Sequence, residues 1–108
     1  MPERRTPHRR RLAIDDIAGH SNRIAESNLD AALRFLDAVE TTVDLLCEFP
    51  EAGGNVPTTR PEANDLRAKL VNGFGNYVVL YFVTPETIDI ARVIWGGQEI
   101  DQIALDCK

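Results

Sequence analysis

In the first half of the chain, apolar residues recur at the three- and four-residue spacing that is typical of amphipathic helices. Between about Arg10 and Ser27 this spacing predicts a first helix. Gly19 and His20 weaken this helix without ending it. The residues that the spacing places on one face are Ile14, Ile17, Ala18, Ser21, Ile24 and Ala25.

A second helix is predicted to begin after Asn28 and to end before Pro50. Asn28 is a favoured N-cap residue, and Asp30 lies in the first turn, where the helix dipole favours a negative charge. Proline pushes the residue before it out of the helical region. Because only two or three residues separate the two helices, they are predicted to form an antiparallel hairpin. The apolar stripe of the second helix consists of Phe35, Val39, Val43 and Leu46.

The second half of the chain reads as a long loop over residues 50–65, followed by strands. Short turns at 72–76 and 85–86 indicate an antiparallel meander. Residues 98–108 are predicted to form a short helix. The expected fold class is therefore α+β, an N-terminal antiparallel helical hairpin packed on a three- to four-stranded antiparallel sheet, with a short C-terminal helix. The predicted strands are Leu66–Val71, Tyr77–Thr84 and Thr87–Trp95.

The charges are distributed unevenly along the chain. The net charge is -5, from 12 basic and 17 acidic residues. Residues 1–11 contain five arginines and one glutamate, which leaves 7 basic and 16 acidic residues elsewhere, a balance of -9. An acidic body is repelled by phosphate backbones, which disfavours direct sequence-specific DNA binding. We expect residues 1–9 to be a flexible basic arm and residues 10–108 to form a single domain.

The cysteines and the hydropathy of the chain indicate a reduced, cytoplasmic protein. Cys47 and Cys107 lie far apart, and neither has a Cys or His neighbour at metal-ligand spacing. No apolar stretch approaches the roughly 20 residues that span a bilayer. We therefore expect no metal, no cofactor and no membrane partner.

The usual enzyme signatures are missing from the sequence. The Gly-Phe-Gly at residues 73–75 lies between two strands and is typical of a turn rather than of a phosphate-binding loop. His8 and His20 are the only histidines, and both lie in the N-terminal third. The pattern of residues proposes no Ser/His/Asp arrangement.

Two arginines in the predicted sheet are candidate catalytic residues. Arg67 lies on the polar face of the first strand, beside Lys69. Strict alternation places Arg92 in an apolar row with Ile88, Ile90 and Ile94. A charge in such a row must be paired, lie at a bulge or point out of an open edge. An ion pair with a helix carboxylate and a role in a reactive site are both compatible with this position.

The candidate binding residues belong to the same sheet. Most aromatic residues in strands are core residues, but Trp95 precedes a Gly-Gly turn and is the best candidate for an exposed interface anchor. The set consists of Lys69, Phe74, Tyr77, Tyr81, Trp95 and Gln98.

Four stretches of this sequence together resemble the RelE/ParE family of toxins from bacterial toxin–antitoxin pairs. The resemblance covers roughly residues 10–105, in the right order, and implies the same helical hairpin against an antiparallel sheet. The N-terminal strand of that family is shortened here to the residues around Thr6–Arg9. The stretches are Ala25–Phe35, Phe49–Gly53, Leu66–Arg67 with Val71–Tyr81, and Ile88–Ile100.

Three positions depart from residues that are common in the family. Phe82 stands where a basic residue often follows the tyrosine, Trp95 where many members have histidine, and Gln98 where many have arginine. RelE-like members cut messenger RNA in the ribosomal A site, a reaction that needs basic groups to neutralise the phosphate and move protons. Only Arg67, Lys69 and Arg92 remain for that role.

The resemblance therefore implies ParE-like inhibition of DNA gyrase, which needs a protein-binding surface and no catalytic constellation. RelE-like RNA cleavage on the ribosome, with Arg67 and Arg92 as catalytic residues, and a non-toxic homologue retained for antitoxin binding are the alternatives. All three readings imply a cognate antitoxin, ParD-like or similar, that lays an extended or helical segment across the toxin. A homodimer and a heterotetramer with the antitoxin are both open.

Overall fold

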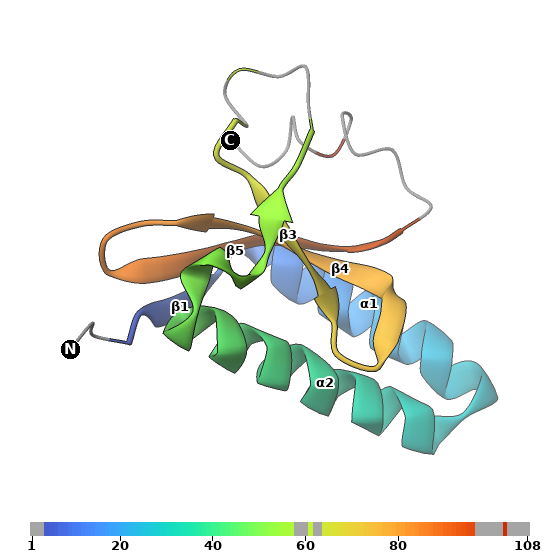
Figure 1. The fold of residues 1–108 in the computed structure, drawn as a ribbon. Coiled ribbons are helices and arrows are strands. Elements are labelled where there is room, and N and C mark those ends of the chain that lie inside the picture. The colour runs from blue at the N-terminus through green and yellow to red at the C-terminus, as the bar shows by residue number, and fades with distance from the viewer. Residues whose placement is uncertain (1–3, 58–60, 62–63, 97–102, 104–108) are drawn as a thin grey trace.

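The structure, a computed structural model, describes residues 4–57, 61, 64–96 and 103, and it shows a helical hairpin covering one face of a sheet (Figure 1). The five strands lie in the order β1-β5-β4-β3-β2. The elements are β1 (Thr6–Arg9), α1 (Arg11–Ser27), α2 (Leu29–Glu48), the 3-10 turn η1 (Pro50–Ala52), β2 (Gly54–Asn55), β3 (Arg67–Val71), β4 (Phe74–Val83) and β5 (Thr87–Trp95).

The α+β class is confirmed, but the expected three- to four-stranded antiparallel sheet is wrong in two details. The sheet has five strands and is mixed, because β1 pairs in parallel with β5 while the other pairs are antiparallel. The strand β2 comes from the range expected to be loop and has two residues only. The helix expected at residues 98–108 falls outside the described residues, apart from Ile103.

Residues 6–9 form β1, the short N-terminal strand that the family resemblance implied, and not part of a flexible arm. The neighbouring arginines that suggested a solvated segment are held by carboxylates of α1, α2 and β5. Each exposed pair contributes little by itself. The pairs of Arg4 and Arg9 tie the N-terminal segment to α2 and that of Arg10 ties it to β5, whereas Arg11 pairs within α1. The ion pairs are Arg4 with Asp44 and Glu48, Arg9 with Glu40, Arg10 with Asp89, and Arg11 with Asp15.

Asn28 alone joins the two helices, and the predicted hairpin is confirmed. Its backbone N–H donates to the carbonyl of Ile24 at 2.9 Å, which closes α1. Its side-chain oxygen accepts the N–H of Ala31 at 3.0 Å, which caps α2 as predicted. A single residue thus satisfies backbone groups at both helix ends, which makes the turn between the helices tight.

The buried face of α1 differs from the predicted one. Ala13 and His20 are buried, and Ile17 and Ile24 pack beside them, whereas Ile14 is 48% exposed. The predicted face mixed residues of the buried row with residues of the neighbouring, exposed row of α1. The histidine in the buried row was not expected to belong to the core. The stripe predicted for α2 is fully buried.

Apolar residues are buried on both faces of the sheet. The larger core lies between the helices and the sheet and is centred on Phe35, Val39, Tyr81 and Ile90. A smaller core on the opposite face joins Leu66, Leu80, Ala91 and Ile94 to Val56 and Ile103. Central strands buried on both faces explain why Tyr77–Thr84 reads as a continuous apolar run.

Candidate functional site

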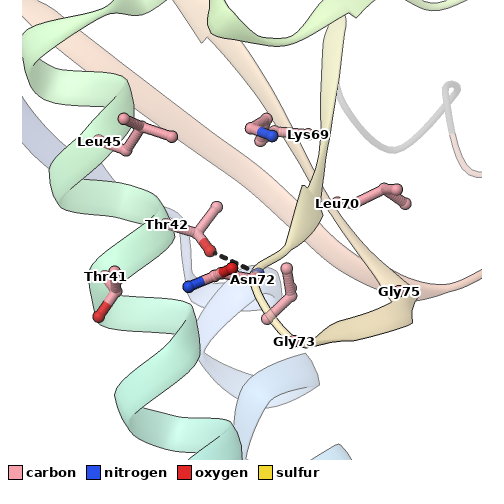
Figure 2. A pocket seen from close by; sticks show the side chains of 9 residues that line it. Thr41, Thr42, Leu45, Lys69, Leu70, Asn72, Gly73 and Gly75 are labelled. Atoms are coloured by element: carbon pink, nitrogen blue, oxygen red, sulfur yellow. Dashed lines mark hydrogen bonds between the residues drawn. The ribbon is translucent and has the colours of Figure 1, made fainter.

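A cleft of about 470 Å³ lies between α2 and the turn that joins β3 to β4 (Figure 2). Thr42 fixes the distance between these elements, because its hydroxyl donates to the carbonyl of Ala38 at 2.8 Å and accepts the N–H of Asn72 at 3.1 Å. Gly73 has a φ of 79°, which favours glycine in this tight turn. The lining residues are Thr41, Thr42, Leu45, Lys69, Leu70, Val71, Asn72, Gly73 and Gly75.

The edge of β3 is open beside this cleft. The strand β2 pairs with Arg67 and Ala68 only, so in the described part of the chain no strand covers residues 69–71 on that side. Figure 2 shows Lys69 on the α2 side of β3 and Leu70 pointing away from α2. Leu45 and Leu70 are 38% and 55% exposed. Exposed apolar side chains beside an open strand edge are suited to an added extended segment.

Arg67 and Tyr81 lie opposite each other on β3 and β4, and both bind the loop after α2. The Tyr81 hydroxyl donates to the carbonyl of Pro50 at 2.7 Å and accepts the N–H of Gly53 at 2.9 Å. The Arg67 guanidinium donates to the carbonyl of Gly53. Burial raises the pKa of Tyr81, against the smaller lowering effects of the Gly53 hydrogen bond and of Arg67. These residues hold a loop in place.

A β-bulge in β5 changes the predicted position of Arg92. Leu80 pairs with Arg92, whereas Tyr81 pairs with Ile90, so Ala91 is the extra residue. The expectation that Arg92 shares an apolar row with Ile88, Ile90 and Ile94 is therefore wrong for Ile88 and Ile90, which precede the bulge. The bulge shifts the alternation, so that Ile90 faces the helices while Ile94 belongs to the opposite core.

The helix α1 covers the edge of β5 beyond the end of β1. Arg92 donates two hydrogen bonds to Asp16, at 2.7 and 2.9 Å, and the same carboxylate accepts the N–H of Val93 at 3.0 Å. One turn later, Nε2 of His20 lies 2.8 Å from the carbonyl oxygen of Val93 and must carry the proton it donates. The ion pair with a helix carboxylate, one of the two predicted roles of Arg92, is thus present.

The two candidate catalytic arginines are engaged in different contacts. Arg67 lies opposite Tyr81 and Arg92 opposite Leu80, and these two residues belong to the cores on opposite faces of the sheet. Each guanidinium binds a different structural partner.

The predicted binding residues divide into core and surface. Tyr81 is fully buried, and Phe74 and Tyr77 are half-buried against Phe35, with ring centroids 5.5 and 4.9 Å from it. Lys69 lines the cleft described above. Trp95 is 49% exposed, as predicted, and its role as an interface anchor stays a prediction. Gln98 lies outside the described residues.

Trp95 borders a second cleft, of about 410 Å³, against α1. Sequence reasoning did not select Asp16 and His20, whose partners are about 75 positions away, or Leu45, which looks like another core residue of α2.

Among the described residues no group of three or more His, Cys, Asp or Glu could hold a metal ion, and no helix is long and apolar enough to cross a membrane.

A helical hairpin packed on one face of a mixed sheet, with an open edge at β3, defines a small α+β protein. The family described as the ParE toxin of the type II toxin–antitoxin system parDE matches residues 9–100. The chain belongs to this family. It is a ParE-type toxin, and its family implies an antitoxin partner.

Comparison with solved structures supports the same fold. One similar chain is described as "Chromosomal ParDE TA system from P. aeruginosa". It is 16% identical, the match covers 84% of this chain and 95% of that one, and the TM-score is 0.67. At this identity the likeness extends to the fold alone. No curated protein matches this sequence.

Proposed function

We propose that this toxin inhibits DNA gyrase in the manner of ParE toxins and that a cognate antitoxin, ParD-like or similar, neutralises it. The observation that supports this function over RNA cleavage is the engagement of Arg67 and Arg92 in separate structural contacts. Cleavage of RNA needs basic groups that converge on one phosphate and move protons. Inhibition through protein binding needs only an exposed surface of suitable shape.

The antitoxin is proposed to add an extended segment to the open edge at residues 69–71. Alternate side chains of an added strand would contact Leu45 and the stem of Lys69 on one face and Leu70 on the other. An acidic residue in that segment could pair with Lys69. Covering these side chains removes the apolar surface that the free toxin exposes.

Gyrase inhibition is tested with purified gyrase, circular DNA and the purified chain, by measuring supercoiling and cleaved DNA. We expect supercoiling to fall and cleaved DNA to accumulate, and the antitoxin to reverse both effects. In cells, induced expression should arrest growth and activate a DNA-damage reporter, while a reporter of translation arrest should not respond.

The same experiment separates the alternatives. Translation arrest with cut messages would contradict gyrase inhibition and assign RelE-like cleavage. Normal growth with folded, antitoxin-binding protein would assign a non-toxic homologue. Variants for this test should be Arg67→Lys and Arg92→Lys, because alanine at either position removes a structural contact and confuses loss of folding with loss of activity.

A further inference from the structure

The outer face of α1 carries a regular pattern of charge around a glycine. At spacings of three and four residues this face presents a cation, an anion, a glycine, a cation and an anion. Residues at these spacings lie together on one face of a helix. All five are exposed: Arg11, Asp15, Gly19, Arg23 and Glu26.

We propose that two copies of the chain associate through this face, with their α1 helices antiparallel and Gly19 at the two-fold axis. Asp15 lies four residues before Gly19 and Arg23 four residues after it, each about 6 Å along the axis. The axis therefore places Asp15 of each copy opposite Arg23 of the other. Further out, Arg11 lies opposite Glu26. A two-fold interface requires such self-complementarity, and a parallel pairing would oppose like charges.

In the part of the chain that the structure describes, no contact requires glycine at position 19. Glycine in a helix interior is less stable than alanine by roughly 0.5–1 kcal/mol. A Cβ at Gly19 would meet no atom within 4 Å, so the packing of this chain does not exclude alanine there. Close approach of a second helix would explain the glycine, because interaxial distance depends on the side chains at the contact.

The cleft beside Gly19 supplies the rest of the surface. Asp15, Gly19, Arg23 and Trp95 all line it, and Trp95 is 49% exposed. A second α1 laid along this face would place its side chains in the cleft and cover part of the indole. Trp95 is the only tryptophan in the chain, so its fluorescence reports on this cleft alone.

The exposed leucines of α2 are less suited to a second copy. Leu29, Leu33 and Leu36 form an exposed row, but Asp30 and Asp37 flank it. In an antiparallel pair centred on Leu33, Asp30 of one copy would approach Asp37 of the other. The repulsion between them favours α1 as the self-association surface.

The proposed dimer goes beyond the proposed function and leaves the candidate antitoxin site open. The helix α1 packs against β5, whereas α2 packs against β3, which holds the open edge. A pair of single helices covers less than the roughly 1,200–2,000 Å² of a standard stable interface. We therefore expect a dissociation constant in the micromolar range or weaker, rising with salt.

The dimer is tested by sedimentation equilibrium and Trp95 fluorescence on the full chain, from about 10 μM to about 1 mM, a range suited to weak association. We expect a concentration-dependent dimer and a shift of Trp95 emission to shorter wavelength. Asp15→Arg alone and Arg23→Asp alone should each weaken association at least tenfold. Mixing these two variants, or combining both changes in one chain, should restore it, because each arrangement opposes unlike charges again.

Two further variants test the role of Gly19. Gly19→Leu should prevent association while the circular dichroism spectrum stays unchanged, and Gly19→Ala should weaken it less. Arg34→Asp, on the exposed face of α2, is the matched charge-reversal control and should leave the dimer intact.

A wild-type chain that stays monomeric throughout would overturn the proposal. So would a dimer that survives both single charge reversals, or a mixture of the two variants that fails to associate. None of these measurements involves gyrase or antitoxin, so the dimer can fail while the proposed function stands.

Discussion

The carboxylate of Asp16 on α1 binds the guanidinium of Arg92 on β5 through two hydrogen bonds, of 2.7 and 2.9 Å. Both side chains are largely covered, with 15% and 14% of their surface exposed. The same carboxylate accepts the N–H of Val93. Asp16 therefore neutralises the charge of Arg92 at the bulge and also satisfies a backbone donor at the edge of β5. Beyond Ile90, where the pairing with β1 ends, α1 covers the edge of β5.

Asp16→Ala should lower the free energy of unfolding by about 2–4 kcal/mol, because it removes the carboxylate that binds a largely buried guanidinium and a backbone N–H. Urea denaturation measures this change. Asp15→Ala is the matched control at concentrations where the chain is monomeric, since among the described residues Asp15 is exposed and pairs with Arg11 of its own helix. Its effect should stay within about 0.5 kcal/mol. Equal effects of the two substitutions would contradict the structural role of Asp16.

Gly53→Ala should destabilise the protein while Gly54→Ala should not. A Cβ at Gly53 would lie 2.6 Å from both the carbonyl oxygen of Ala68 and the Tyr81 hydroxyl, whereas a Cβ at Gly54 would meet nothing within 4 Å. We expect a loss of roughly 1–3 kcal/mol at position 53 from the forced movement of the loop. Thermal unfolding of the two variants provides the comparison, and a stable Gly53→Ala protein would show that the loop tolerates displacement.

Stability should fall as the pH rises through the alkaline range. Burial raises the pKa of the Tyr81 phenol above its ordinary value of 10.0 and that of the Cys47 thiol above 9.0. The unfolded chain then releases these protons at lower pH than the folded chain does, so the stabilisation is complete below the unfolded pKa values and is lost as pH rises through the folded ones.

The contribution of Tyr81 can be isolated with Tyr81→Phe. Urea midpoints measured from pH 7 to about pH 11 should fall less steeply above pH 10 in this variant than in the wild type. A wild-type midpoint that is constant across this range would contradict the prediction.

Leu70→Glu should weaken antitoxin binding at least tenfold if the antitoxin adds a strand at the open edge of β3, because the exposed leucine would contact the added segment. Isothermal titration calorimetry with the purified antitoxin measures the change. Leu29→Glu is a control on the exposed start of α2, since Leu29 is 64% exposed and does not line the cleft. Unchanged affinity for Leu70→Glu would place the antitoxin elsewhere.

Local chemistry made much of the fold predictable. The Asn28 cap, the stripe of α2 and the strand Thr87–Trp95 depend on residues within a few positions of one another, and all three agree with the structure. The functional class was also accessible, because four stretches in the correct order resemble one family that the comparison confirms.

The position of Arg92 was not predictable in the same way. Alternation along a strand assumes an uninterrupted ladder, and nothing near Arg92 in the sequence announces the bulge at Ala91. The buried His20 was missed because its acceptor, Val93, is 73 positions away.

The sequence by itself determined the helical hairpin, the antiparallel meander and the ParE resemblance, since each follows from short-range spacing or from the order of motifs. Only the tertiary structure decided that residues 6–9 pair in parallel with β5, that α1 covers the edge of β5, and that the two candidate arginines bind different structural partners. The physical reason is that ion pairs and edge contacts depend on which distant segments meet in the fold. In the sequence alone, the same charges and backbone groups are equally compatible with exposure to solvent.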